Sequence, residues 1–204
     1  TATYYEEYEF ITGMSLNDSL KSAKFDAGSY DFSAKVDLTP KGQITGTMSC
    51  VLSSAEDAGA IPQKMLYTTN YYDKYGHLLR TISENQLKGK EVVSNIYEDI
   101  TYLLKQSKQQ HYYNGKTLTL EKKFDYDHMG RLLDTREKVN SQAEFTLNAM
   151  KYNEMGQLLT KYLHSDNTSG SCTFVQKVDY NYNIRGWLNW INDPTLASEN
   201  DLFG

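Results

Sequence analysis

Four short stretches of the 204-residue chain are variants of one pattern. Each places an aromatic residue first, then Asp or Asn, two free positions, Gly, one polar or aromatic residue and Leu. The stretches begin at Tyr72, Tyr126, Tyr152 and Tyr182. A unit this short cannot bury its own faces, so a chain built from such units must stack them on one another. The repeat therefore favours a scaffold, a wrapper or a binding surface over an enzyme.

The glycines of the pattern set its period. The steps from Gly130 to Gly156 and from Gly156 to Gly186 are 26 and 30 residues, whereas the step from Gly76 to Gly130 is 54. A degenerate copy at residues 97–104 fits inside that longer step, with Thr101 in the glycine position. The steps then become 25, 29, 26 and 30 residues. The sequence predicts about five units, one of them degenerate.

Each unit predicts a strand, a tight turn and a second strand. Asp or Asn opens the turn, because its side-chain oxygen accepts hydrogen bonds from backbone N–H groups ahead of it. Two free positions fit a type I turn, and Gly follows where the chain needs a positive φ. Thr101 adopts a positive φ poorly, so we expect a different turn in the degenerate copy. The expected turn residues are Tyr72, Asp73, Gly76, Tyr126, Asp127, Gly130, Tyr152, Asn153, Gly156, Tyr182, Asn183 and Gly186.

Two columns of leucine follow the turns. The first column contains Leu78, Leu132, Leu158 and Leu188, and the second contains Leu79, Leu133 and Leu159. Adjacent residues of a strand face opposite sides of a sheet. We therefore expect a sheet that is covered on both sides near the turns, and polar residues farther along the strands indicate that this cover is incomplete.

The chain divides into three expected regions. Residues 1–62 form a β-rich lead-in segment, residues 63–192 carry the hairpin repeats, and residues 193–204 form an extended tail. Strand-like runs within the lead-in segment cover residues 3–11, 29–38 and 43–52. No run predicts a helix longer than two turns.

Composition limits the partners of the chain. The formal net charge is −5 and no basic face stands out, so we expect no nucleic-acid partner. No apolar run reaches about 18 residues, so we expect no membrane span. No signal peptide is visible at Thr1 and the chain begins within a strand-like pattern, so we expect a segment of a longer polypeptide. Cys50 and Cys172 leave both a disulfide and two unpaired cysteines open.

The pattern resembles the YD repeat of the Rhs family, whose core is a Tyr-Asp-x-x-Gly-Arg-Leu unit. Residues 126–132 match that unit at every defined position. The copies at 72 and 152 depart at the arginine, with His77 and Gln157, and the copy at 182 departs at Asn183 and Trp187. Residues 182–190 resemble a segment of Rhs-type proteins of Bacteroidetes, as do residues 201–204 and 44–47. The resemblance is specific over residues 63–204.

The resemblance implies an architecture and partners. In Rhs, teneurin and insecticidal-complex proteins, YD repeats form a strip of β-hairpins that spirals into a hollow shell, which in bacteria commonly wraps a C-terminal toxin. The implied fold is all-β, with consecutive antiparallel β-hairpins in a curved, twisted open sheet, a partial spiral or shell segment. The implied partners are neighbouring repeats of the same polypeptide and an enclosed C-terminal toxin or passenger. The family also includes cell-surface proteins, so the implied location is the cell surface or the secreted fraction.

No set of residues predicts catalysis, a cofactor or a metal site. The four histidines, His77, His111, His128 and His164, show no metal-ligand spacing, and those at 77 and 128 read as solvated turn residues. The Asp and Asn residues of the repeat are explained by opening the turns, and Asn cannot act as an acid.

Trp187 and Trp190 carry the alternative hypothesis. They lie three residues apart, hence on opposite faces of a strand. With Tyr180 and Tyr182, one face can offer an aromatic platform on which a sugar ring stacks. In the competing interpretation these rings pack on the neighbouring hairpin.

Two functions are therefore open. The first is a non-enzymatic structural segment of an Rhs/YD-repeat shell or cell-surface protein. The alternative is a carbohydrate-binding surface module. Exposed sheet edges recruit other strands, so we also expect edge-mediated, concentration-dependent homo-association.

Overall fold

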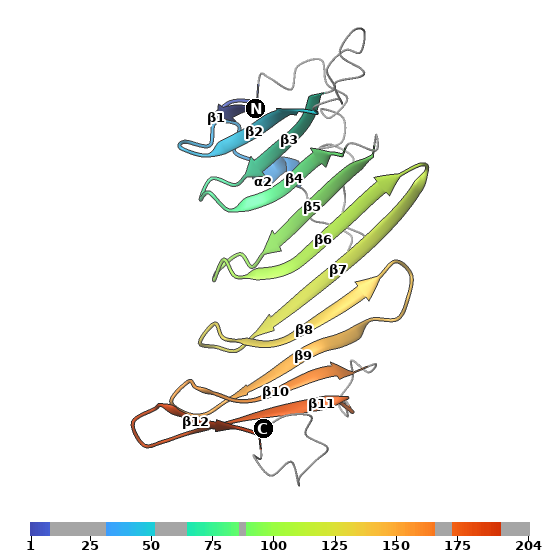
Figure 1. Ribbon diagram of the computed structural model, residues 1–204. Helices are drawn as coiled ribbons and strands as arrows, with labels where there is room; N and C mark the ends of the chain where they lie inside the picture. The colour runs from blue at the N-terminus through green and yellow to red at the C-terminus, as the bar shows by residue number, and fades with distance from the viewer. Residues whose placement is uncertain (9–31, 52–64, 86–88, 166–172, 193–204) are drawn as a thin grey trace. The chain divides into compact units, whose positions relative to one another are not determined.

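The computed structural model describes residues 1–8, 32–51, 65–85, 89–165 and 173–192 (Figure 1). These residues form twelve strands and one single-turn helix. The elements are β1 (Ala2–Tyr5), α2 (Phe32–Lys35), β2 (Ile44–Cys50), β3 (Met65–Tyr72), β4 (Leu78–Glu84), β5 (Lys90–Tyr97), β6 (Leu104–Tyr113), β7 (Lys116–Tyr126), β8 (Leu132–Val139), β9 (Phe145–Tyr152), β10 (Leu158–Ser165), β11 (Gln176–Tyr182) and β12 (Leu188–Ile191).

The strands lie in the sheet in the order in which they occur in the chain. Each strand from β1 to β12 is hydrogen-bonded to the next, and the sheet does not close on itself. The pairs whose register is defined are all antiparallel. The prediction of an all-β open sheet of consecutive antiparallel hairpins is confirmed.

Two compact units make up the chain. The first contains Thr1–Ile96 and Lys108–Thr119, and the second contains Tyr97–Ser107 and Leu120–Gly204. The β6–β7 hairpin contributes to both units. Its turn has Asn114 at φ 48° and Gly115 at φ 72°, the two consecutive positive values that a type I′ hairpin turn requires.

A buried cluster of Tyr71, Ile82 and Val92 forms the core of the first unit, and each of these side chains is at most 1% exposed. The three lie on one face, because Ile82 is the cross-strand partner of both Thr69 and Val92. Tyr8 stacks on Tyr71 with 5.1 Å between ring centroids. Val36 also packs against the cluster, so residues that follow β1 in the chain cover this face.

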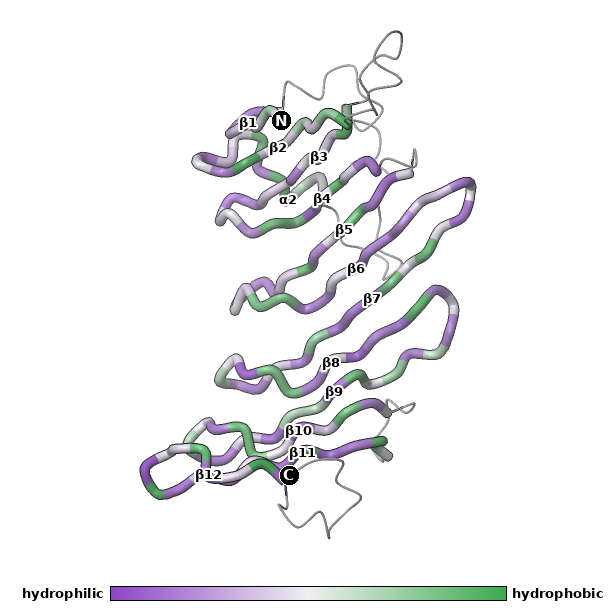
Figure 2. The backbone as a smooth tube through the Cα atoms, viewed as in Figure 1, coloured by the Kyte–Doolittle hydropathy of each residue, from purple (hydrophilic) through white to green (hydrophobic). Residues whose placement is uncertain are grey.

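The second unit buries much less apolar surface. Among its described residues Val178 is the one buried hydrophobic side chain, while Leu133 and Leu159 are 37% and 40% exposed. Figure 2 shows hydrophilic residues interspersed with hydrophobic ones along the strands. The second leucine column is therefore covered at Leu79, which is 1% exposed, and incompletely covered at its two later leucines, and Leu188 of the first column is 51% exposed.

On one face of the second unit, ion pairs connect the strands where the first unit has a buried apolar cluster. Arg136 of β8 contacts Asp125 of β7, and its Nε lies 3.2 Å from Asp134 Oδ1. Lys123 Nζ lies 2.5 Å from Glu144 Oε2. Burial and the nearby Glu144 carboxylate raise the pKa of Asp134. Partly exposed pairs of this kind stabilise a fold by about 0–1 kcal/mol each. The backbone hydrogen bonds between the strands are therefore the main interactions that hold this part of the sheet together.

One strand expected from the sequence is wrong. Within residues 29–38, Phe32–Lys35 form α2, and Val36 makes an isolated bridge with Asp73. Ala34 and Lys35 favour a helical turn, and the Asp37 N–H donates to the Tyr72 carbonyl at 2.8 Å, so this segment lies beside the β3–β4 turn.

The other expected regions of the lead-in segment and tail are placed as follows. The run at 43–52 corresponds to β2. Of the run at 3–11, residues 3–5 lie in β1, which ends before Glu6 with its φ of 62°, and residues 9–11 lie outside the described residues. The expected tail at 193–204 lies outside the described residues. No helix in the described part of the chain is long and apolar enough to cross a membrane.

Candidate functional site

The turns of the repeat hold most of the polar side chains that the sequence singles out. In the β7–β8 turn, Asp127 Oδ1 accepts hydrogen bonds from the N–H groups of Met129 and Arg131, both at 2.9 Å. The backbone closes the same turn, because the Gly130 N–H donates to the Asp127 carbonyl at 2.9 Å. Gly130 has a φ of 77°. This left-handed value favours glycine.

The same arrangement recurs in three other turns. Gly76, Gly156 and Gly186 have φ values of 85°, 85° and 81°. The side-chain acceptors are Asp73 Oδ1 for the N–H groups of Tyr75 and His77, Asn153 Oδ1 for that of Gln157, and Asn183 Oδ1 for those of Arg185 and Trp187. Asp and Asn therefore have the same role in these turns. That role requires a side-chain oxygen that accepts hydrogen bonds and does not require a charge.

A second side-chain contact closes three of the turns. Arg131 Nε donates to Asp127 Oδ2 at 2.6 Å, and His77 Nδ1 lies 2.9 Å from Asp73 Oδ2. Burial raises the pKa of each aspartate, but the hydrogen bonds from the side chain and backbone ahead outweigh it, so both pKa values lie below the ordinary range. In the Asn153 turn, the Asn Nδ2 donates to Gln157 Oε1 at 2.8 Å.

The repeat tyrosines tie each hairpin to the one before it. Each hydroxyl donates to the carbonyl oxygen of the residue that begins the second strand of the preceding hairpin. The donor and acceptor pairs are Tyr72 to Ile44 at 3.0 Å, Tyr126 to Leu104 at 3.0 Å, Tyr152 to Leu132 at 2.8 Å and Tyr182 to Leu158 at 3.0 Å. The Tyr position thus contributes a stacking contact in addition to its place in the strand.

In two of the turns, the residue after the glycine reaches the turn of the next hairpin. A Cβ added to Gly156 would lie 3.3 Å from Arg131 Nη1, and one added to Gly186 would lie 3.1 Å from Gln157 Nε2. Gln157 Nε2 also donates to the Gly186 carbonyl at 3.1 Å. The Arg131 guanidinium lies 4.8 Å from the ring centroid of Tyr152. The residue at this position, which is Arg in the YD pattern, therefore packs on the following unit.

The degenerate copy turns differently from the others. The Glu98 N–H donates to the Leu103 carbonyl at 2.9 Å, which makes its loop one residue longer than that of Asp73 and His77. The positive φ falls on Tyr102, at 56°, and not on Thr101. Thr101 Oγ1 instead donates to Glu98 Oε2 at 2.5 Å. A non-glycine residue in this conformation is strained by about 1 kcal/mol or more.

A further unit, which sequence reasoning missed, is split by an insertion. Tyr5 pairs with Ile44 as Tyr72 pairs with Leu78, and the Glu6 N–H donates to the Gln43 carbonyl at 3.2 Å. Gly42 has a φ of 71°, and its N–H donates to Glu6 Oε1 at 2.7 Å. Residues 7–41 stand where the other turns have two residues. Gly-Gln-Ile at 42–44 is the sequence signal, since it matches the Gly-polar-apolar end of the repeat.

Two grooves run between successive turns. One, of about 660 Å³, lies in the second unit between the loop that holds Leu103 and residues 127–130. The other, of about 340 Å³, lies in the first unit between the segment that holds Gln43 and residues 73–76. Both have mixed walls of acidic, basic and apolar side chains. The two grooves are equivalent places in the repeat, so they follow from stacking.

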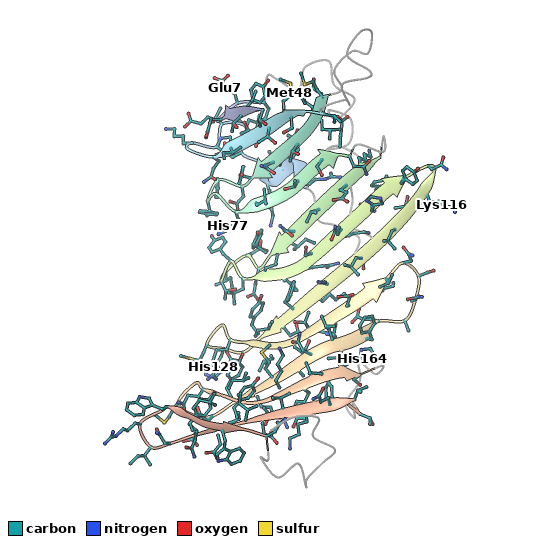
Figure 3. All side chains as sticks on the ribbon, in the orientation of Figure 1. Glu7, Met48, His77, Lys116, His128 and His164 are labelled. Atoms are coloured by element: carbon teal, nitrogen blue, oxygen red, sulfur yellow. The ribbon has the colours of Figure 1, made fainter. Side chains whose placement is uncertain are left out.

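The histidines occupy separate places. His77 lies beside the β3–β4 turn and His128 lies in the β7–β8 turn (Figure 3). His111 Nδ1 lies 3.0 Å from Glu91 Oε1, and the His164 ring packs on Phe145 with 5.3 Å between centroids. No group of three or more His, Cys, Asp or Glu side chains in the described ranges is placed to hold a metal ion. Cys50 carries a free thiol, and Cys172 lies outside those ranges.

Both tryptophans lie at the last hairpin and are exposed. Trp187 is 63% exposed and Trp190 is 43% exposed. Trp187 precedes β12, and the Arg185 guanidinium lies 5.5 Å from its ring. Trp190 is the cross-strand partner of Asn181, so it does not share a face with Tyr180 and Tyr182. Trp190 is therefore not part of an aromatic face with these two tyrosines.

Comparison with models of known protein families finds no match, and neither does comparison with curated proteins. The repeat and its contacts are therefore the features of this chain that bear on its function.

Proposed function

We propose that this chain is a non-enzymatic structural segment of a YD-repeat protein of the Rhs type. The repeat tyrosine supports this proposal most strongly, because in four hairpins its hydroxyl bonds to the preceding hairpin. The acidic residues of the repeat are likewise occupied in closing their own turns. A residue set that serves stacking in every unit suits a scaffold whose partners are its own neighbouring repeats.

A deletion in phase with the repeat tests the scaffold role. Removing residues 131–156 deletes 26 residues, one whole period, and joins Gly130 to Gln157. The new turn keeps the Asp-x-x-Gly-polar-Leu order, so we expect a β-rich protein that unfolds cooperatively. A matched deletion of residues 131–143 is out of phase and should not fold cooperatively. Equal loss of cooperative unfolding in both variants would argue against a modular scaffold.

The proposal extends to a passenger and a location. In the resembling proteins such repeats wrap a C-terminal toxin, and some stand at the cell surface. In the longer polypeptide, the array should protect a C-terminal region from protease. For the location, the repeats should be labelled by a surface reagent on intact cells or be recovered from the medium. Full sensitivity of that region in the folded protein would count against wrapping.

Carbohydrate binding is the second candidate, favoured by the exposure of Trp187 and Trp190. An exposed indole offers a face on which the C–H groups of a sugar stack. A glycan-array signal that Trp187→Ala or Trp190→Ala abolishes would support this function. A blank array with both rings intact would leave the scaffold role alone.

A further inference from the structure

Adjacent hairpins of this chain pair in one fixed register. In each junction pair, one partner lies two positions after the first residue of a hairpin's second strand. The other partner lies three positions before the repeat tyrosine of the next hairpin. Four pairs show this relation, namely Gly46 with Thr69, Arg80 with Ser94, Asp134 with Ala149 and Thr160 with Asp179. Register is usually set by turns and side-chain patterns, and here it is the same at every junction for which it is defined.

The outer strand β12 presents one half of this junction. Leu188 occupies the position whose carbonyl accepts the tyrosine hydroxyl at four internal junctions, and it is 51% exposed. Trp187 occupies the position that packs on the next glycine, and it is 63% exposed. Among the described strands, β12 pairs with β11 alone.

The outer strand β1 presents the complementary half. Tyr5 occupies the tyrosine position and is 57% exposed. Gly42 occupies the glycine position, and a Cβ added there would meet no atom within 4 Å. By contrast, Gly76, Gly156 and Gly186 are each approached by a side chain of the preceding turn.

We propose that the β12 edge of one copy binds the β1 edge of a second copy, antiparallel and in the register of the internal junctions. That register places Trp190 opposite Ala2 of the second copy. The Tyr5 hydroxyl then donates to the Leu188 carbonyl, and the Trp187 ring covers Gly42. This inference rests on the proposed role of the hairpin as a stacking unit.

The contact is heterologous, because two different edges meet. A heterologous contact leaves one free edge of each kind on every dimer, so it extends to longer assemblies unless rotation closes it into a ring. β1 has four residues, so each junction has few ladder hydrogen bonds and association should depend on concentration.

Light scattering on the whole chain across a wide concentration range is the first measurement. The proposal expects the average mass to rise beyond that of a dimer. Tyr5→Phe removes one junction hydrogen bond, so it should raise the dissociation constant about two- to tenfold. Tyr113→Phe, at an exposed residue away from both edges, should leave it unchanged. A chain that stays monomeric throughout overturns the proposal.

Register and polarity are tested by disulfide trapping in a Cys50→Ser, Cys172→Ser background. One protein carries Ala2→Cys and a second, of different tagged mass, carries Trp190→Cys. Paired antiparallel residues lie within the Cα distance that a disulfide spans, so oxidation of the mixture should give mainly the mixed dimer. Replacing Trp190→Cys by Asn189→Cys should lose most of that product.

Mainly like-with-like dimers, or equal trapping at positions 189 and 190, would overturn the stated register. Circular dichroism on each variant checks that the fold is retained. The in-phase deletion separates the two proposals. If that variant folds while the intact chain remains monomeric, the scaffold role stands and the end-to-end contact fails.

Discussion

The Asn153 turn offers the sharpest test of how these hairpins are held. Asn153 Oδ1 accepts from the Gln157 N–H at 2.8 Å, and its Nδ2 donates to Gln157 Oε1 at 2.8 Å. Gln157 Nε2 then donates to the Gly186 carbonyl of the next hairpin at 3.1 Å. A change at Asn153 should therefore act on its own turn and on the neighbouring one.

Three variants separate the contributions. Asn153→Ala removes both side-chain bonds, each contributing about 0.5–1.5 kcal/mol, so the free energy of unfolding should fall by about 1–2 kcal/mol after partial replacement by water. Asn153→Asp keeps the acceptor but opposes its second oxygen to Gln157 Oε1, at a cost of about 0.5–1.5 kcal/mol. Adding Gln157→Arg recreates the Asp127–Arg131 pair and should return the stability to within about 0.5 kcal/mol of the parent.

Urea unfolding followed by tryptophan fluorescence measures these changes, because Trp187 and Trp190 lie in the hairpin that Gln157 contacts. The expected order of midpoints is parent, double variant, Asn153→Asp, then Asn153→Ala. An Asn153→Ala protein as stable as the parent would refute the turn-opening role. A double variant less stable than Asn153→Asp would refute the equivalence of the two turns.

Four further outcomes follow from single residues. Tyr152→Phe should lower the free energy of unfolding by about 0.5–1.5 kcal/mol through the lost bond to Leu132, whereas the exposed control Tyr113→Phe should change it by less than about 0.5 kcal/mol in the same urea assay. Gly115→Ala has free space but a positive φ, so it should cost about 1–2 kcal/mol by thermal unfolding. Folding lowers the pKa of Asp73, so the stability that the ionised carboxylate adds to the fold is present above the ordinary value of 3.8. It is lost as the pH falls through the lower pKa of the folded state. The urea midpoint of Asp73→Asn should therefore depend less on pH across that range. Burial raises the pKa of Tyr71 to about 12, so stability present below the unfolded value near 10 should be lost as pH rises toward 12. Burial also raises the pKa of Tyr8, so tyrosinate absorbance should show a group of late-titrating tyrosines that Tyr71→Phe reduces by one.

Local patterns in the sequence were enough to predict the hairpins. The spacing of Asp or Asn, Gly and Leu specifies a strand, a turn and a strand within about ten residues, and the fold repeats that local rule. The all-β open sheet could be predicted for this reason, and the structure confirms it. The split turn could not be found in the same way, because 35 residues separate Glu6 from Gly42, whereas two separate Asp127 from Gly130.

The sequence did not show on which face each tryptophan lies, because the pairing of β11 and β12 is irregular. The register shifts between Asn181 and Tyr182, which leaves Asn189 as an extra residue and moves Trp190 opposite Asn181. A bulge of one residue exchanges the two faces of a strand. The cover over Tyr71 was missed for another reason, since Tyr8 lies 63 positions away in the chain.

The split turn also shows where this fold tolerates new sequence. Its two ends, Glu6 and Gln43, are hydrogen-bonded to each other at 3.2 Å, so whatever lies between them leaves and re-enters the sheet at one point. The loop-closure cost of a longer excursion grows only slowly with its length. Other turns with the same closure, such as that from Asp127 to Arg131, should therefore accept a grafted domain whose termini lie close together, without disturbing the strands on either side.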